Sequence, residues 1–148
     1  MDIGSKQGYP ASALSNFSPH PFVFDGVECN SMEGLLQSFK FKSIEMQAHV
    51  CTLVGKTAKF KGKKKNWYVT QKLYWKGKEI DRHSVEYQIL LNNAFKALAT
   101  NDSFRKALLA TNDATLTHSM GKSDASHTIL TTSEFCGRLI KIRNLLKT

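Results

Sequence analysis

Cysteines, prolines and acidic residues are scarce in this chain of 148 residues, and long apolar runs are absent. Its three cysteines, Cys29, Cys51 and Cys136, are widely spaced and form no Cys-x-x-Cys, which argues against a disulfide framework and a zinc site. We expect each to be a small buried apolar residue. No apolar run approaches the ~20 residues of a membrane span, and the N-terminus lacks the order of a signal peptide. We therefore expect a cytoplasmic protein without a membrane partner.

Common nucleotide-binding and catalytic motifs are also missing. The chain contains neither Gly-x-Gly-x-x-Gly nor a complete Gly-x-x-x-x-Gly-Lys-Ser/Thr, since Gly121-Lys-Ser matches only the end of the second motif. A P-loop nucleotidase is therefore not expected. The histidines show no metal-ligand spacing, and no acyl-transfer triad is recognisable. We expect neither a metal nor any other cofactor.

Negative charge is in short supply, because 12 Asp and Glu stand against 21 Lys and Arg, which gives a formal net charge of +9 and a pI near 9.6. Such a surplus attracts polyanions, so a phosphate-bearing ligand or nucleic acid is a natural partner. It is equally compatible with a device for solubility. Six lysines lie within residues 56–65, a run typical of a solvated loop or of an edge that attracts phosphate.

The hydrophobic pattern predicts one α+β domain over residues 1–148, predominantly helical with a few short strands. Residues 1–13 are expected to form an irregular lead-in. Two short strands around Asp25-Gly26 are expected to form a hairpin, and Lys76-Gly77 is expected to be a turn. Helices are predicted over residues 30–41, 43–55, 84–99, 104–109 and 131–146, and strand character over residues 116–120. Ser84 is the expected N-cap of the third helix, Asn101 or Asp102 is expected to start the fourth, and Thr131-x-x-Glu134 has the pattern of a capping box at the fifth.

The stretch from Asn30 to Phe41 carries the clearest functional pattern. In a helix, Glu33, Gln37 and Lys40 fall at i, i+4 and i+7, so a carboxylate, an amide and an ammonium lie on one face beside an apolar flank. Such a helix packs into a core by one flank and lines a cleft with the other. The spacing alone favours a simpler interpretation, in which Asn30 is the N-cap and Glu33 holds the capping-box position.

Several short segments follow one another in a characteristic order. The first are Leu14-Ser-Asn-Phe-Ser-Pro, Phe22 to Asp25-Gly26, and Glu33-x-x-x-Gln37-x-x-Lys40-Phe41. The later ones are Asn66-Trp67, Asp81-Arg82, Tyr87, Phe95, Leu108-Leu109 and Leu116-Thr-His118. This order resembles the signature of the YbiA-like NADAR family, which is named for its association with NAD and ADP-ribose metabolism. The resemblance covers the chain from about residue 14 onward. It implies a YbiA-like fold and cleavage of an N-glycosidic bond. Some members resemble hydrolases of phosphoribosylamino pyrimidine intermediates, and others remove ADP-ribose from guanine bases in nucleic acid.

With the resemblance added, Glu33 becomes the expected active-site carboxylate, which stabilises positive charge on the ribose or activates water. Lys40 is expected to hold a phosphate, to hydrogen-bond the ribose or to attack C1 as an amine, and the sequence does not choose among these roles. Asn16 is expected to bind ribose hydroxyls, Gln37 to position the substrate, and Phe17 to stack on a base or to anchor the core. Trp67 and Tyr87 are expected to stack on a base or to be core aromatics, and Arg82 and the lysines near Lys56 to bind phosphates. The remaining expected substrate-binding residues, in the late loop, are His118, Gly121 and Lys122.

The late loop departs from the family pattern. Many members carry a Trp-Gly pair where this chain has His118-Ser-Met-Gly121-Lys122-Ser-Asp124, so the substrate is left open. We predict an N-glycosidase, and within that class an ADP-ribosyl glycohydrolase that removes ADP-ribose from guanine. The alternatives are a hydrolase of phosphoribosylamino pyrimidines and a non-catalytic module that binds ADP-ribose or nucleic acid. Expected partners are ADP-ribose or a phosphoribosyl molecule, and ADP-ribosylated DNA or RNA.

Overall fold

The computed structural model of this protein describes residues 1–148 and confirms the predicted α+β class. It contains seven α-helices and two small antiparallel sheets of two strands each. In chain order the elements are η1 (Ser12–Leu14), β1 (Phe22–Phe24), β2 (Val27–Cys29), α1 (Met32–Ser38), α2 (Ile44–Cys51), α3 (Gly55–Lys63), α4 (Trp67–Thr70), β3 (Lys72–Trp75), β4 (Lys78–Asp81), α5 (Val85–Leu98), α6 (Asp102–Ala110) and α7 (Thr132–Leu146). None of the helices combines the length and the apolar character that crossing a membrane requires.

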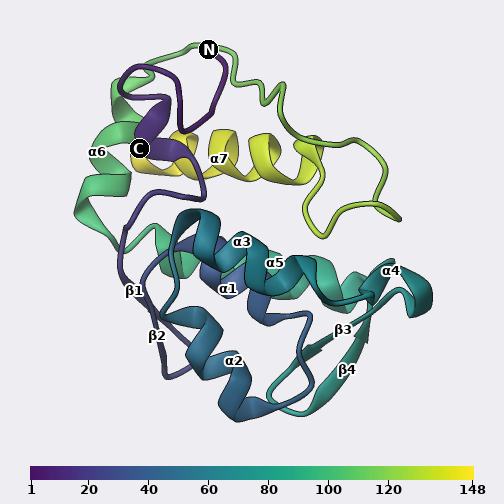
Figure 1. Cartoon of the computed structure of the whole chain (residues 1–148). Coiled ribbons are helices and arrows are strands. Elements are labelled where there is room, and N and C mark those ends of the chain that lie inside the picture. The colour runs from purple at the N-terminus through teal and green to yellow at the C-terminus, as the bar shows by residue number, and fades with distance from the viewer.

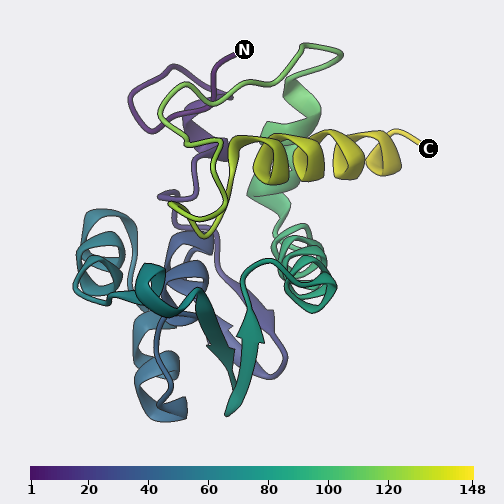
Figure 2. The same cartoon turned by 90° about the vertical axis from the view of Figure 1, so that its right-hand side faces the viewer.

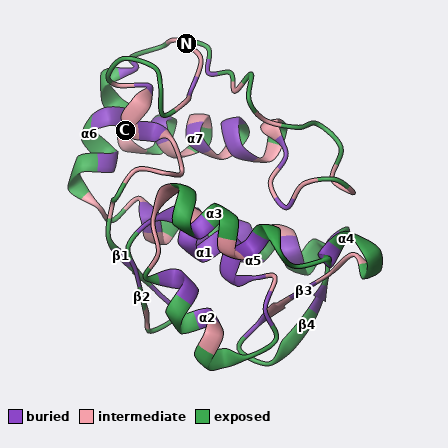
Figure 3. Cartoon of the chain, in the orientation of Figure 1, coloured by how far each residue is buried: buried purple, intermediate pink, exposed green.

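The elements form two layers, which are visible in Figures 1 and 2. The N-terminal segment, α7 and the long loop that precedes α7 make the upper layer. The two hairpins and the helices α1, α2, α3 and α5 make the lower layer, in which α1 contacts each of the other three helices. A continuous core of 29 buried residues includes side chains from both layers, and buried residues follow the inward faces of the helices (Figure 3).

Both hairpins close through turns that their sequences specify. Asp25 and Gly26 have φ values of 49° and 77°, and Lys76 and Gly77 have φ values of 47° and 85°. Two successive residues with positive φ are the requirement of a type I′ turn, which explains why glycine occupies the second position in each. The Asp25 carboxylate also accepts a hydrogen bond of 2.9 Å from Trp75 Nε1, so the first turn is tied to the second hairpin.

Polar N-caps set the starts of most helices. Ser84 caps α5, Asn101 caps α6, and Thr131 forms a capping box with Glu134 at the start of α7, as the sequence predicts. The start of α1 differs from the prediction by one residue, because Ser31 and not Asn30 is its N-cap.

The lysine-rich segment is the main departure from the predicted secondary structure. The second helix ends at Cys51, and most of residues 56–65, predicted as a loop or an edge, form α3. Ala58 and Gly62 are buried one turn apart, and α3 packs against α1. Lysine is a good helix former, and the packing of this pair against α1 adds to that preference.

The N-terminal lead-in lies along residues 115–119. Before η1, its regular structure is limited to a bridge between Asp2 and Thr117. This bridge is also the only part that forms of the strand expected over residues 116–120. Ile3 is fully buried, and the terminal ammonium donates a 2.7 Å hydrogen bond to the Thr115 carbonyl. These contacts hold the first residues of the chain in the upper layer, beside the late loop.

Candidate active site

A cavity of about 700 Å³ lies between the two layers. Residues of α1 and α3 form its lower wall, and residues 4–6, the loop of residues 118–130 and the start of α7 form its upper wall. This volume is in the range of ~300–1,000 Å³ that is usual for ligand sites. The structure brings together these residues that the sequence singled out: Asn16, Phe17, Glu33, Gln37, Lys40, Trp67, His118, Gly121 and Lys122.

Glu33 faces this cavity and does not cap its helix. The N-cap Ser31 accepts a 3.1 Å hydrogen bond from the backbone N–H of Gly34, so the capping-box position belongs to Gly34 and the simpler interpretation of Glu33 is wrong. The Glu33 backbone N–H donates to the Asn16 carbonyl over 3.0 Å. Its Oε2 accepts a 2.8 Å hydrogen bond from Gln37 Nε2. The first contact therefore fixes the backbone of Glu33 and the second its carboxylate, whose Oε1 has no protein donor.

Lys40 lines the same cavity, but it lies in a turn after α1 and not in the helix, where it was predicted. Helix α1 ends at Ser38, and the Lys40 N–H donates to the Gln37 carbonyl over 3.1 Å in the turn that follows. The ammonium lines the cavity together with Glu33, although no ion pair within 4.0 Å joins them. Glu33, Gln37 and Lys40 therefore line the same cavity as predicted, although Lys40 lies beyond the end of the helix.

Burial alters the acid–base behaviour of both groups. It raises the pKa of Glu33 above the ordinary carboxyl value, against the opposing effects of the Gln37 hydrogen bond and of the charges on Lys40, Lys59 and His118. Burial also lowers the pKa of Lys40 to about 8, with the charge of Lys122 acting in the same direction and that of Glu33 opposing it. A carboxyl and an amine shifted in this way within one cavity are a typical mark of a reactive site.

Two buried oxygen atoms in the cavity wall have no hydrogen-bond partner. They are Asn16 Oδ1 and Gln37 Oε1, which are both acceptors. Buried polar atoms are nearly always paired, and α3 covers Gln37 Oε1, since a Cβ atom on Gly62 would lie 1.8 Å from it. Asn16 Oδ1 is therefore the unpaired acceptor left for a donor on a ligand. Ribose hydroxyls are donors of the required kind.

Gly62 of α3 allows the close approach that holds Gln37 in place. A Cβ atom at this position would lie 1.8 Å from Gln37 Oε1, 2.7 Å from its Cδ and 3.0 Å from its Cβ. Any side chain at position 62 therefore displaces the amide that hydrogen-bonds Glu33. The sequence alone gave no reason to single out this glycine, because the contact joins two helices.

We expect Gly62→Ala to impair the site without unfolding the protein. The added methyl group forces Gln37 away from Glu33, and loss of that hydrogen bond raises the pKa of Glu33 further. The gain of about 1 kcal/mol in helix propensity partly offsets the strain in α3. Titration of Glu33 by NMR measures the pKa change, and Gly137→Ala in α7 is the matched control, since nothing lies within 4 Å of a Cβ there. An unchanged Glu33 titration in Gly62→Ala would contradict the assigned role of Gln37.

Lysines surround the carboxylate on all sides of the cavity. Three of them, Lys56, Lys59 and Lys63, follow one face of α3 at i, i+3 and i+7. The others are Lys6 of the N-terminal segment, Lys40 and Lys122. None of the six takes part in an ion pair, whereas Glu33 is the cavity's one acidic residue. An unpaired set of ammonium groups favours a ligand with several negative charges, such as a diphosphate.

The late loop is fixed by contacts with the N-terminal segment and α7. His118 Nδ1 lies 2.7 Å from the Ile3 carbonyl oxygen, and since a carbonyl can only accept, Nδ1 carries the proton. The His118 ring packs edge-on against Phe135 with ring centroids 5.2 Å apart. A Cβ atom on Gly121 would lie 2.5 Å from Thr132 Oγ1, which explains a glycine there. Nε2 of His118 is thereby left without a protein partner.

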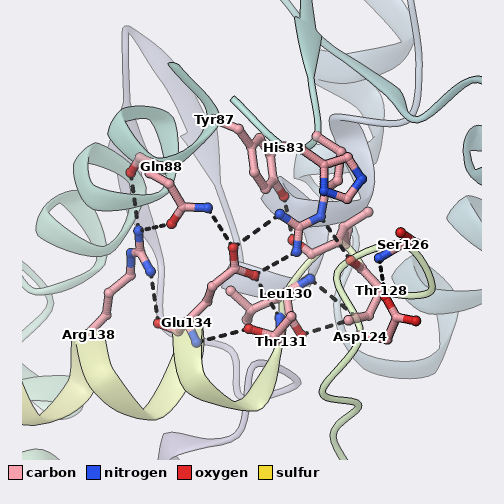
Figure 4. A network of polar contacts seen from close by, with 12 residues as sticks. His83, Tyr87, Gln88, Asp124, Ser126, Thr128, Leu130, Thr131, Glu134 and Arg138 are labelled. Atoms are coloured by element: carbon pink, nitrogen blue, oxygen red, sulfur yellow. Dashed lines mark hydrogen bonds and ion pairs between the residues drawn. The ribbon is translucent and has the colours of Figure 1, made fainter. Parts of the chain in front are cut away.

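Arg82 and Tyr87 do not line this cavity, in contrast to the prediction. Figure 4 shows Tyr87 in a polar network at the N-terminal end of α7, and the hydrogen bonds of Arg82 to Glu134 place it in the same network. Arg82, 1% exposed, donates to both Glu134 oxygens over 2.7 and 3.1 Å and to the Thr128 carbonyl over 2.9 Å. Tyr87 donates to the Ile129 carbonyl over 2.5 Å. Their role is to hold residues 128–130, which do line the cavity.

No cluster of three or more His, Cys, Asp or Glu side chains is arranged as metal ligands. The three cysteines are free and buried, as expected.

Known proteins resemble this chain in sequence and in fold. The chain belongs to the family described as bacteriophage protein GP30.3, whose model matches residues 8–144. It is 36% identical over 153 residues to the "uncharacterized 17.1 kDa protein in Gp30-rIII intergenic region" of Enterobacteria phage T4, an alignment that covers 99% of this chain and 96% of that protein. Among solved structures it is similar to the E. coli protein YbiA, with a TM-score of 0.63 at 20% identity over 99% of this chain and 84% of YbiA. The fold is therefore YbiA-like, as the sequence resemblance implied.

Proposed function

We propose that this protein is an N-glycosidase of the NADAR type that hydrolyses the bond between ribose C1 and a base nitrogen, with ADP-ribose linked to guanine as its substrate. The observation that carries the proposal is a single buried carboxylate, Glu33, placed in a cavity that otherwise offers unpaired lysines. The YbiA-like fold supports it.

The geometry suits the charge changes of this reaction. Cleavage of the C1–N bond develops positive charge on the ribose, and an ionised Glu33 facing C1 stabilises that charge. Glu33 then takes a proton from water as the hydroxyl adds to C1. The electrons of the broken bond pass to the leaving nitrogen, which takes a proton from the Lys40 ammonium. Water is thus divided between the two products, and proton return from Glu33 to Lys40 through solvent restores the site.

The distribution of lysines favours an ADP-ribosyl over a phosphoribosyl substrate. They come from four separate segments around the cavity: the N-terminal residues, the turn after α1, helix α3 and the late loop. A single phosphate is too small to contact groups on several walls, whereas a diphosphate bridge between two riboses extends along them. The unpaired Asn16 Oδ1 provides an acceptor for a ribose hydroxyl at the end near Glu33.

The pH dependence of hydrolysis distinguishes the roles of Lys40. Glu33 must be ionised, so the rate rises with pH through the raised pKa of Glu33. If the Lys40 ammonium is the proton donor, the rate falls as pH rises through about 8, the pKa of Lys40. We therefore expect a bell-shaped profile of kcat, and a Lys40→Arg variant whose slow residual rate has no alkaline decline near pH 8. A rate that instead increases through pH 8 would identify Lys40 as an amine nucleophile.

Incubation of the purified protein with three substrates tests the proposal. They are ADP-ribosylated guanosine, a modified oligonucleotide and a phosphoribosylamino pyrimidine, with the products separated by mass. Release of free ADP-ribose from the first two is the expected result. Release from the pyrimidine alone would favour the riboflavin-intermediate hydrolase, and binding of ADP-ribose without any release would favour a non-catalytic module.

A further inference from the structure

An exposed basic and aromatic surface adjoins the cavity, separate from the residues that line it. Helix α3 presents two neighbouring rows of side chains. Lys59 and Lys63 point to the cavity, and the residues that follow each of them, Phe60 and Lys64, lie about 100° further round the helix and are exposed. Lys65, Tyr68 and Val69 continue this exposed surface into α4, and we refer to these five residues, Phe60, Lys64, Lys65, Tyr68 and Val69, as the α3–α4 surface.

The charge of this region is not neutralised by the protein. No Asp or Glu occurs between Glu45 and Glu79. The six lysines of residues 56–65 form no ion pair, whereas the next three lysines along the chain are paired with acidic residues of the hairpins and α5. Solubility alone accounts for unpaired lysines, since ion pairing would cancel their charge, but it does not account for six of them within ten residues beside a cavity. A concentrated, unpaired run next to a cavity instead favours an extended anionic ligand.

The exposed aromatics indicate what kind of polyanion fits. Phe60 and Tyr68 are 55% and 57% exposed, whereas most of the other aromatic side chains are buried. Lys63 Nζ lies 6.0 Å from the centre of the Phe60 ring, so a cation and a ring face are offered together. Bases of a single strand stack on such rings while lysines contact the phosphates, whereas a duplex keeps its bases stacked on one another.

We propose that the α3–α4 surface binds single-stranded nucleic acid and delivers one modified nucleotide to the cavity. The inference extends the proposed function, because it makes the modified base part of a polynucleotide. The strand itself needs no modification to bind, so the surface can be tested independently of hydrolysis. Trp67, which lines the cavity between Lys65 and Tyr68 in the chain, marks where the two sites join.

Fluorescence anisotropy with an unmodified, labelled 12-nucleotide single strand measures this binding. We expect Phe60→Ser/Tyr68→Ser to weaken binding at least tenfold, since stacking contributes substantially for each base. Lys64→Gln/Lys65→Gln is expected to weaken binding and to reduce the slope of log affinity against log salt by about 0.7 for each phosphate that the variant no longer neutralises. The charge-matched control is Lys106→Gln/Lys141→Gln, which removes two exposed lysines from α6 and α7.

The binding measurements test the surface alone. Equal binding by the wild type and both surface variants, an equal loss in the control, or tighter binding of a duplex of the same length would overturn the proposal. Circular dichroism spectra confirm that the variants are folded. Release of ADP-ribose from a free modified nucleoside is expected to be unchanged in the surface variants. Failure of that reaction in the wild type would overturn the proposed function, and strand binding would still be tested by anisotropy.

Discussion

Glu33→Gln is expected to abolish release of ADP-ribose from modified guanosine while the protein remains folded. Glutamine has nearly the same shape and its amide oxygen can still accept the hydrogen bond from Gln37. It can neither carry the negative charge nor take the proton from water. Loss of a catalytic carboxylate costs ~10²–10⁴ in rate. Product formation measured by mass at neutral pH checks this result.

The same substitution should not reduce thermal stability. Because burial raises the pKa of Glu33, the folded protein binds this proton more tightly than the unfolded chain does, and the stabilisation is lost as pH rises through the raised pKa. Above this raised pKa the wild type therefore holds an unfavourable buried charge that glutamine lacks. We expect a Tm equal to or above that of the wild type, with exposed Glu45→Gln on α2 as a control. An active variant, or one with a much lower Tm, would contradict a catalytic role for Glu33.

Arg82→Met is expected to cause a large loss of stability. The substitution removes both hydrogen bonds to Glu134, which is 13% exposed, and the bond to the Thr128 carbonyl. Removal of one partner of a buried ion pair costs about 3–5 kcal/mol, because the other charge stays buried. For a chain of this size that corresponds to a fall in Tm of roughly 10 °C, measurable by calorimetry.

The pH dependence of that loss identifies its cause. Burial acts to raise the pKa of Glu134, but hydrogen bonds from Arg82, Gln88 and the Thr131 backbone outweigh it and lower the pKa. The stabilisation is therefore present above the ordinary carboxyl pKa and disappears as pH falls through the lowered value. The difference between Arg82→Met and the wild type should shrink in that acidic range. Arg105→Met, which removes an exposed pair of 3.9 Å, should change stability by less than about 1 kcal/mol. Equal stability of Arg82→Met and the wild type would remove the structural role of the network.

The sequence predicts correctly those features that depend only on residues close together in the chain. The Asp25-Gly26 and Lys76-Gly77 turns were predictable because two adjacent residues decide the backbone conformation. The starts of α5 and α7 followed from Ser84 and Thr131 for the same reason. Glu33 and Gln37 came together because one helical turn separates them, and the helix forms as predicted apart from its ends.

Long-range contacts decided the rest. Arg82 was expected at a phosphate because nothing near it in the chain reveals its partner, Glu134, which lies 52 residues away. The lysine run was expected to be irregular because its charge conceals the buried side of α3, where Gly62 meets Gln37. Lys6 was not anticipated as a site residue, since it reaches the cavity only through the contacts between the lead-in and residues 115–119.

The most direct test of the account is a time course of wild-type protein with ADP-ribosylated guanosine in H₂¹⁸O, followed by mass spectrometry of the products. We expect free ADP-ribose with one ¹⁸O atom at C1 of the released ribose, together with unlabelled guanosine, and neither product from Glu33→Gln. Intact substrate after prolonged incubation with folded wild-type protein, or equal release by Glu33→Gln, would contradict hydrolysis at this cavity.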